Sequence, residues 1–448
     1  MSRKYFGTDG IRGAVGSLHM NAAFALKLGW AAGRALTGGD GARVLIGKDT
    51  RRSGYMFESA LEAGLSSAGV DVDLLGPLPT PGVAYLTRAL RADAGIVISA
   101  SHNPHHDNGF KFFGADGYKL SDAIELQIEK LLDSEPQTVE ASRLGSARRI
   151  DDANGRYIEF CKSTFPAQRN LNGMRLVLDC AQGAAYRVAP AVFEELGAEV
   201  AVIGNTPDGL NINQDCGSTH LQALAAAVQA QGADLGVAFD GDADRCLMVG
   251  PDGATLDGDD LLYIIARHRA DNGRLRGPVV GTLMSNLGLE QALQQMGSKL
   301  LRAKVGDRHV LELLKQHDAE LGGESSGHTI CLDLSTAGDG VITALQVLAA
   351  MIQSGQGTVE LTADLQKFPQ VLINVKVSGS AQALIERGEI QVAASQAERA
   401  LGGHGRLLLR ASGTEPLVRV MVEAEDQAMA DSVAQQLAAV VRECAATN

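Results

Sequence analysis

The 448-residue chain has 45% hydrophobic and 21% charged residues, which suits a globular protein with several cores. Its net charge of −13 argues against a general partner for nucleic acids or anionic membranes, because both present negative surfaces. No apolar run approaches the roughly 20 residues of a membrane span, and the N-terminus lacks the apolar core of a secretory signal. The six cysteines lie far apart without a CxxC pair, which favours reduced thiols and a cytoplasmic location.

Apolar runs alternate with helical patterns through the first two thirds of the chain. Residues 43–47 predict a strand followed by a helix near 55–69, and residues 94–98 predict a strand before a helix that begins near 121. The middle of the chain continues this alternation, with a helix near 187–196 and strands predicted at 175–179, 199–203, 234–239, 278–282 and 298–303. Alternation of this kind predicts doubly wound, mainly parallel α/β domains.

One helix in this middle region has apparent start and stop signals. Thr219 and Gln222 have the spacing of a capping box, in which each side chain hydrogen-bonds to the backbone at the other position. Gly232 suits the left-handed position that ends many helices. The sequence therefore predicts a helix that starts after Thr219 and stops at Gly232.

The pattern changes after Pro369. Residues 371–377 and 406–410 alternate with period two, a strand is predicted at 417–424, and an Ala/Gln-rich helix follows at 428–442. These elements predict an antiparallel α+β module. The predicted fold is therefore three doubly wound, mainly parallel α/β domains and a C-terminal antiparallel α+β domain, with boundaries at 1–150, 151–252, 253–366 and 367–448.

Ser101 follows the predicted strand at 94–98 and precedes Pro104 in a small polar turn. In open α/β sheets, ligands bind beyond the carboxyl ends of the strands, which would present this hydroxyl to a substrate. A purely structural Ser-Asn-Pro turn explains the same residues when they are taken alone. The interpretation of Ser101 as a nucleophile depends on the motifs that follow.

Asp240, Asp242 and Asp244 alternate just past another predicted strand. Three carboxylates so close together repel one another unless a cation neutralises them, and carboxylate oxygens are the ligands that Mg²⁺ prefers. The loop does not match an EF-hand, because Arg245 replaces the glycine at position 6 and Pro251 replaces the glutamate at position 12. A magnesium site is favoured over a solvated acidic turn.

Two glycine-containing loops carry groups suited to a phosphosugar. In Gly322–His328, Glu324 and Ser326 offer partners for sugar hydroxyls, although a solvent-exposed loop explains this segment equally well. The C-terminal segment has hydroxyls, a glycine and guanidinium groups that suit a phosphate clamp, whereas a β-hairpin turn is the alternative. The residues of this clamp are Arg410, Ser412, Gly413, Thr414 and Arg419.

Taken in order, the motifs TDGIRG, SASHNP, DGDADR, GGESSGH and RASGTEPLVRV resemble those of the α-D-phosphohexomutase family over the whole chain. The opening KYFGTDGIRG resembles the branch of the family that acts on glucosamine phosphates. The resemblance implies four domains around a central cleft, a phosphoserine at Ser101, and Mg²⁺ held there by Asp240, Asp242 and Asp244. It further implies a bisphosphate activator, namely glucosamine 1,6-bisphosphate or glucose 1,6-bisphosphate, and a homodimer.

The resemblance also implies roles for the remaining residues. Arg245 would brace the phosphoserine, Glu324 and Ser326 would bind sugar hydroxyls, and the C-terminal clamp would hold the phosphate that is not transferred. Candidates for the proton acceptor are Lys111, His309 and His328, with Arg12 as a cationic neighbour, and the sequence does not separate them.

The activity implied is the interconversion of glucosamine 6-phosphate and glucosamine 1-phosphate, which supplies amino-sugar nucleotides such as UDP-N-acetylglucosamine. The runner-up is a mutase for glucose or mannose phosphates. A phosphatase built on the same serine and metal, and a non-catalytic phosphosugar-binding protein, are the alternatives from other classes.

Overall fold

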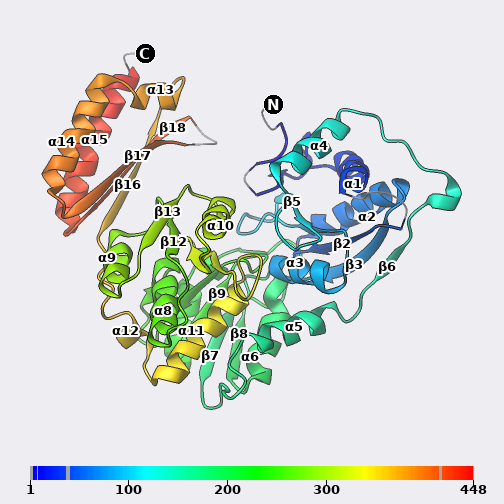
Figure 1. The fold of residues 1–448 in the computed structure, drawn as a ribbon, viewed down its shortest axis with the longest axis horizontal. Helices are drawn as coiled ribbons and strands as arrows, with labels where there is room; N and C mark the ends of the chain where they lie inside the picture. Colours follow the sequence, from blue (N-terminus) through cyan, green and yellow to red (C-terminus); the bar gives the residue numbers. More distant parts are fainter. Residues whose placement is uncertain (1–3, 8, 37–40, 413–415, 447–448) are drawn as a thin grey trace. The chain divides into compact units, whose positions relative to one another are not determined.

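The computed structural model describes residues 4–7, 9–36, 41–412 and 416–446. The chain divides into two compact units (Figure 1). Unit 1 consists of Met1–Thr282 with Ala303–Thr362, and unit 2 consists of Leu283–Arg302 with Ala363–Asn448.

The first sheet of unit 1 has six strands in the order β1-β5-β4-β2-β3-β6. Strands β4, β2, β3 and β6 are parallel, whereas β5 returns antiparallel between β4 and β1. The strands are β1 (Ile11–Ala14), β2 (Arg43–Lys48), β3 (Asp71–Pro77), β4 (Ala94–Ile98), β5 (Asp107–Gly114) and β6 (Ala147–Arg149). The helices are α1 (Ala22–Leu36), α2 (Arg52–Ser67), α3 (Thr80–Ala89) and α4 (Asp122–Leu132).

The second sheet has the order β11-β10-β9-β7-β8, in which β9, β7 and β8 are parallel and β10 is antiparallel to both of its neighbours. Its strands are β7 (Arg175–Asp179), β8 (Glu199–Ile203), β9 (Leu235–Phe239), β10 (Cys246–Val249) and β11 (Thr255–Leu256). The helices of this region are α5 (Ala153–Ser163), α6 (Val188–Glu195) and α7 (Gln222–Gln231).

The predicted capping box of α7 is wrong. The residue that precedes α7 is Leu221, which has no capping side chain, and Thr219 lies in a separate 3₁₀ turn. The predicted end is confirmed, because Gly232 adopts a left-handed conformation with φ of 58°.

In the third region of unit 1, β12 (Val279–Thr282) is parallel to β14 (Leu321–Gly323), and β14 is antiparallel to β15 (Thr329–Cys331). A capping box does occur here, at Asp257 and Asp260, where it starts α8. The helices are α8 (Gly258–Asp271), α10 (Asp307–Gln316), α11 (Gly340–Ser354) and α12 (Thr358–Leu361).

Unit 2 contains a fully antiparallel sheet in the order β16-β18-β17. Its strands are β16 (Gln370–Lys376), β17 (Gly405–Ala411) and β18 (Leu417–Ala424), and its helices are α13 (Ala381–Ile385), α14 (Gly388–Leu401) and α15 (Gln427–Ala446). Helix α9 (Leu287–Gln295) and most of β13 (Leu300–Ala303) also belong to this unit. The predicted class, α/β sheets followed by an antiparallel α+β domain, is confirmed.

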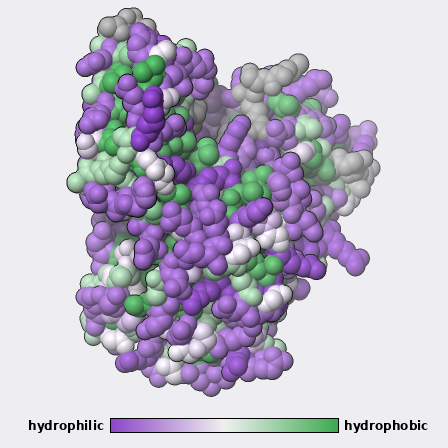
Figure 2. All heavy atoms as spheres, turned by 60° about the vertical axis from the view of Figure 1, so that its left-hand side comes forward, coloured by the Kyte–Doolittle hydropathy of each residue, from purple (hydrophilic) through white to green (hydrophobic). Residues whose placement is uncertain are grey.

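The surface in Figure 2 is mainly hydrophilic, with apolar side chains in scattered groups, as is normal for a folded chain. Within the described residues, no helix has both the length and the apolar character that crossing a membrane requires.

Helices α1 and α2 pack closely because Gly64 of α2 lies against the backbone of α1. A Cβ atom at Gly64 would lie 2.0 Å from the carbonyl oxygen of Leu26 and 2.8 Å from the amide nitrogen of Trp30. Gly155 of α5 provides a contrast, because a Cβ atom there meets nothing within 4 Å.

We therefore expect Gly64→Ala to lower the free energy of unfolding by about 1–3 kcal/mol through overpacking. Gly155→Ala, the matched control, should raise it by up to about 1 kcal/mol, because alanine restricts the unfolded chain more than glycine does. Urea unfolding followed by circular dichroism measures both. Equal effects of the two substitutions would contradict the close approach of the helices.

Candidate active site

Ser101 lies in the loop that follows β4, and its side chain meets the acidic loop that follows β9. The Ser101 hydroxyl donates to Asp240 Oδ2 at 2.5 Å, and the Ser101 amide donates to Ser99 Oγ at 2.9 Å. Ser101 is buried and has a φ of 51°, an uncommon conformation for a non-glycine residue. Such local strain persists where the surroundings hold it and clusters at functional sites.

Arg51, which the sequence analysis missed, holds the Ser101 loop in place. Its wholly buried guanidinium donates to the carbonyl oxygens of Ser101 at 2.9 Å and Asn103 at 2.8 Å, and also to those of Pro104 and Asp107. The side-chain amide of Asn213 also donates to the carbonyl oxygens of Ser101 at 2.9 Å and Asn103 at 3.0 Å, so two side chains from other segments hold the loop. A lone arginine in a polar segment gives no sequence signal for this role.

The Asp triad (Asp240, Asp242 and Asp244) is buried at the end of β9. One oxygen from each carboxylate lies within 4.8 Å of the others, and Oδ1 of Asp242 and of Asp244 has no hydrogen-bond partner among the described residues. Burial and the charges of the other two aspartates raise the pKa of Asp240 to about 8. Unpartnered, mutually repelling carboxylate oxygens fit a hard divalent cation such as Mg²⁺.

Lys111 enters the same cluster from β5, where the antiparallel register sets it opposite Val97 of β4. Its Nζ lies 2.7 Å from Asp242 Oδ2, 2.8 Å from Asp244 Oδ2 and 3.3 Å from Asp9 Oδ2. Burial opposes the charge on Lys111, but these carboxylates outweigh burial and raise its pKa well above the usual value. Lys111 is therefore a fixed positive charge in this structure.

A second group of charges joins the N-terminal loop to α10. Asp9 forms ion pairs with Arg12 and Lys119, and Lys119 also pairs with Asp307 at the start of α10. Arg12 was predicted as a cationic neighbour, whereas Asp9, Lys119 and Asp307 were missed. Their separations of 110 and 188 residues in sequence explain why no local pattern indicated these pairs.

His328 follows the loop between β14 and β15 and lies between two carboxylates. Its Nδ1 is 3.6 Å from Asp244 Oδ1, and its Nε2 is 3.6 Å from Asp307 Oδ2. Burial disfavours the charged imidazole, but Asp244 and Asp307 outweigh burial and raise the pKa of His328. His309 differs, because it is one-third exposed on α10, where it faces Glu312 at 3.3 Å.

The remaining predicted residues of unit 1 lie around this cluster. Glu324 Oε1 accepts from the Gly306 amide at 2.9 Å, and Ser326 Oγ is buried without a hydrogen-bond partner in the described part of the chain. Arg245 donates through its backbone amide to Asp240 Oδ1 at 3.1 Å. Burial opposes the charge of its side chain, but Asp240, Asp244 and Glu324 raise its pKa, and its Nε finds no partner among the described residues.

The phosphate clamp lies in unit 2. Arg410 of β17 and Arg419 of β18 are directly opposite each other, and burial together with the charge of Arg419 lowers the pKa of Arg410. The Ser412 amide donates to the Leu417 carbonyl oxygen at 2.9 Å. Gly413 and Thr414 are outside the described residues. Two half-buried guanidinium groups facing each other suit an anion.

Four domain models of phosphoglucomutase/phosphomannomutase match the chain. These are α/β/α domain I at residues 3–139, domain II at 155–253, domain III at 257–368 and the C-terminal domain at 372–440. The chain belongs to the phosphoglucomutase/phosphomannomutase family.

Curated relatives of this family are similar over their full length. The phosphoglucosamine mutase of Alcanivorax borkumensis is 60% identical over 98% of this chain and 99% of its own. That of Ectopseudomonas mendocina is 59% identical over 100% of both chains. Phosphohexomutases of this kind are isomerases.

Solved structures of the family share the fold. A phosphoglucomutase/phosphomannomutase family protein from Burkholderia thailandensis has a TM-score of 0.81 at 26% identity, covering 99% of this chain and 98% of its own. The N-acetylphosphoglucosamine mutase of Aspergillus fumigatus, solved with GlcNAc-6P and magnesium, has a TM-score of 0.69 at 17% identity, covering 99% and 96%.

The raised pKa of Asp240 predicts a pH-dependent cost of burying the triad. Because the folded-state pKa of about 8 exceeds the ordinary 3.8, ionisation of Asp240 disfavours the folded chain, and this cost grows from about pH 4 to about pH 8. Without divalent ions, Asp240→Asn should therefore gain stability relative to the native chain across that window. Urea unfolding at several pH values measures the difference.

The same measurement includes a test of the metal site. Mg²⁺ should stabilise the native chain most at the upper end of the pH window, because a cation favours the ionised triad and binds the folded state. Asp252→Asn, in an exposed turn, serves as the control. A difference between Asp240→Asn and the native chain that stays flat with pH would refute this account of the triad.

Proposed function

We propose that this chain interconverts glucosamine 6-phosphate and glucosamine 1-phosphate, with Ser101 as the phosphoryl carrier. The observation that supports this most directly is the contact of the Ser101 hydroxyl with Asp240, beside Asp242 Oδ1, which is buried without a hydrogen-bond partner among the described residues. The full-length relatives named phosphoglucosamine mutase favour glucosamine phosphates as substrates. A mutase for glucose or mannose phosphates is the second candidate, favoured by the names of the domain models.

The reaction requires two phosphoryl transfers in opposite directions. In the first, the P–O bond to Ser101 breaks while a P–O bond forms to the free hydroxyl of the sugar monophosphate, whose proton passes to a base. The resulting bisphosphate turns around, and its other phosphoryl group returns to Ser101. Glucosamine 1,6-bisphosphate is then both the intermediate and the compound that loads Ser101.

Phosphoryl transfer depends on positioned positive charge more than on covalent help from the protein. Mg²⁺ held by Asp240, Asp242 and Asp244 would neutralise charge on the transferring group. Lys111 and Arg245 border the triad and supply charge whatever the protonation state of the substrate. Arg51 fixes the backbone of Ser101, so the nucleophile oxygen keeps one position in both transfers.

The sugar and its second phosphate need binding groups of their own. Glu324 and Ser326 are proposed to hold the sugar hydroxyls, since Ser326 Oγ is buried without a protein partner among the described residues. Arg410, Ser412, Gly413, Thr414 and Arg419 are proposed to hold the phosphate that is not transferred. Separate guanidinium groups accept a phosphate from either end of the sugar, which the turnaround requires.

Four functional domains are part of the proposal: 1–150 with the phosphoserine loop, 151–252 with the metal loop, 253–366 with the sugar loop and 367–448 with the phosphate clamp. We further propose a homodimer, which sedimentation velocity tests. A cytoplasmic location is also proposed, and the six buried free thiols suit a reducing compartment.

We expect the native chain to carry one phosphoryl group on Ser101 in part of the population and to convert glucosamine phosphate with the highest kcat/KM. Ser101→Ala should lose both the mass increment and turnover. Intact-mass spectrometry, peptide mapping and a substrate panel with Mg²⁺ and a hexose bisphosphate measure these. Phosphate on Ser99 would overturn the assignment of Ser101 as the nucleophile. Faster turnover of glucose or mannose phosphate would overturn the substrate assignment, and release of phosphate without isomerisation would overturn the mutase reaction.

At the reacting centre, we propose that Lys111 acts as a fixed cation beside the transferring group, that His328 is the proton-transfer group, and that His309 does neither. Lys111→Met and His328→Gln should each lower kcat by at least about 100-fold, whereas His309→Gln should stay within about threefold of the native chain. Steady-state kinetics with thermal melting as a folding control measures this. A loss for His309→Gln equal to the other two would reverse the assignment.

A further inference from the structure

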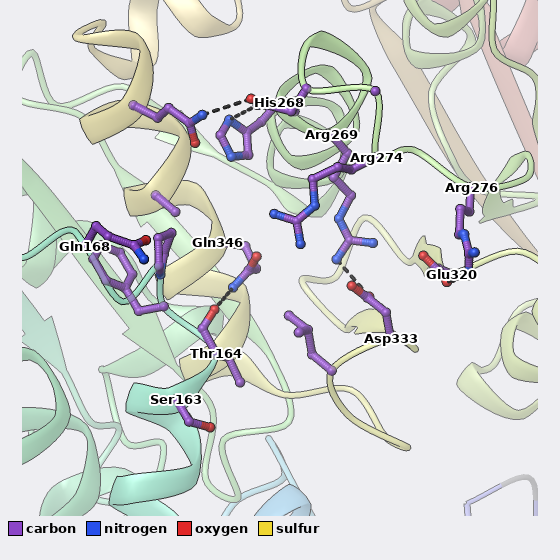
Figure 3. Close-up of a pocket in the computed structure, with 17 residues that line it drawn as sticks. Ser163, Thr164, Gln168, His268, Arg269, Arg274, Arg276, Glu320, Asp333 and Gln346 are labelled. Carbon is purple, nitrogen blue, oxygen red and sulfur yellow. Dashed lines mark hydrogen bonds and ion pairs between the residues drawn. The ribbon is translucent and has the colours of Figure 1, made fainter.

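Unit 1 contains a polar cavity of about 630 Å³ whose lining residues include none of those assigned to the active site. The cavity lies where the end of α5, the last turn of α8 and one face of α11 meet (Figure 3). A volume of this size is within the range of small-molecule sites in proteins. Its lining includes three arginines and one histidine against two carboxylates, in a chain whose net charge is −13.

Two of these arginines keep donors that the protein does not satisfy. Arg269 is 7% exposed and donates through Nη2 to Asp333 at 2.9 Å, while its buried Nη1 has no hydrogen-bond partner among the described residues. Arg274 is exposed, and its side chain has no hydrogen-bond or ion-pair partner in the described part of the chain. Figure 3 shows both guanidinium groups directed into the space between Gln346 and Asp333.

Stabilisation of the C-terminus of α8 does not account for this arrangement. Positive side chains near a helix C-terminus do interact favourably with its unpaired carbonyls. The side chain of Arg269, however, donates to the carboxylate of Asp333 in another segment. The bond from Arg274 to the end of α8 comes from its backbone amide, which donates to Arg269 O at 2.7 Å, and not from its guanidinium group.

We propose that this cavity binds a small phosphate monoester, with Arg269 and Arg274 holding the phosphate. A guanidinium group matches a phosphate with two parallel N–H···O bonds, which is why arginine predominates at such sites. The third arginine, Arg276, is exposed and pairs with Glu320, so it contributes less.

The rest of the lining suits the body of such an ester. The side-chain amides of Gln346 and Gln353 donate through Nε2 to Thr164 O and Asn272 Oδ1. The side-chain oxygen of each glutamine can accept a hydrogen bond from a ligand. Gln168 adds a third amide to the wall. These side-chain oxygens accept hydrogen bonds from hydroxyl and amino groups. The ester therefore carries such groups, on a body small enough for the part of the cavity that the phosphate does not fill.

Two probes distinguish the sources of such an ester: glycerol 3-phosphate for a polyol ester and adenosine 5′-monophosphate for a nucleotide. Hydrogen–deuterium exchange of the full chain, titrated with each probe, should show protection of residues 268–276 and 331–335. Arg274→Glu should weaken this protection by at least about tenfold in concentration, because it replaces a charge-assisted donor by a repelling charge. If one of the two probes gives protection and the other does not, the result supports the site and identifies the body that the cavity accepts.

Arg34→Glu is the matched control, since Arg34 is exposed in the last turn of α1 and the cavity does not include it. It should leave the protection unchanged. Mutase turnover should persist in both variants, which would show that they are folded. If Arg274→Glu loses turnover, Arg274→Ala is used in its place. No protection of 268–276 by either probe up to about 1 mM, the upper end of ordinary substrate affinities, overturns the proposal. Equal protection of Arg274→Glu and the native chain overturns it as well.

Discussion

The charge balance of one buried cluster is the constraint on which the rest of unit 1 depends. Five carboxylates meet at the carboxyl ends of the first two sheets and at α10, and four permanent cations and one imidazole face them. In a low-dielectric interior, an unpaired charge destabilises the folded state by several kcal/mol. Removing any one partner therefore leaves a buried charge that lowers the stability of the protein. The cluster comprises Asp9, Asp240, Asp242, Asp244 and Asp307 with Arg12, Lys111, Lys119, Arg245 and His328.

Strand direction explains how these charges come together. Ser101 follows β4 of the first sheet, and the Asp triad follows β9 of the second sheet. Both lie at the carboxyl ends of parallel strands, where open α/β sheets place ligand-binding groups. Lys111 cannot reach that edge by the same route. It arrives because β5 returns antiparallel beside β4, and the register that pairs Val97 with Lys111 places a cation close to the Ser101 loop. An all-parallel sheet would send this lysine elsewhere.

Sequence patterns predicted the strands that consist of apolar, β-branched runs. They did not predict a strand whose sequence lacks such a run. The buried strands at 94–98 and 175–179 are found within the predicted bounds, whereas β5 reads Asp-Asn-Gly-Phe-Lys-Phe-Phe-Gly and has too many glycines to indicate a strand. The residue types of the site were also predictable, because hydroxyl, carboxylate and guanidinium groups in such loops indicate phosphate chemistry. Arg51 and Asp307 were not, since their importance comes from partners that are distant in sequence and that only the tertiary structure supplies.

The buried charges of this protein fall into two physical kinds. Lys48 and Glu58 form a buried pair of opposite charges that neutralise each other. The Asp triad and the facing arginines 410 and 419 instead bring like charges together, although Lys111 offsets part of the repulsion within the triad. A ligand of opposite charge offsets the repulsion that the protein's own groups leave. The triad is therefore suited to a cation and the facing arginines to an anion. The cavity beside α8 has the same interpretation as the phosphate clamp for a different reason, because the buried Nη1 of Arg269 has no partner among the described residues.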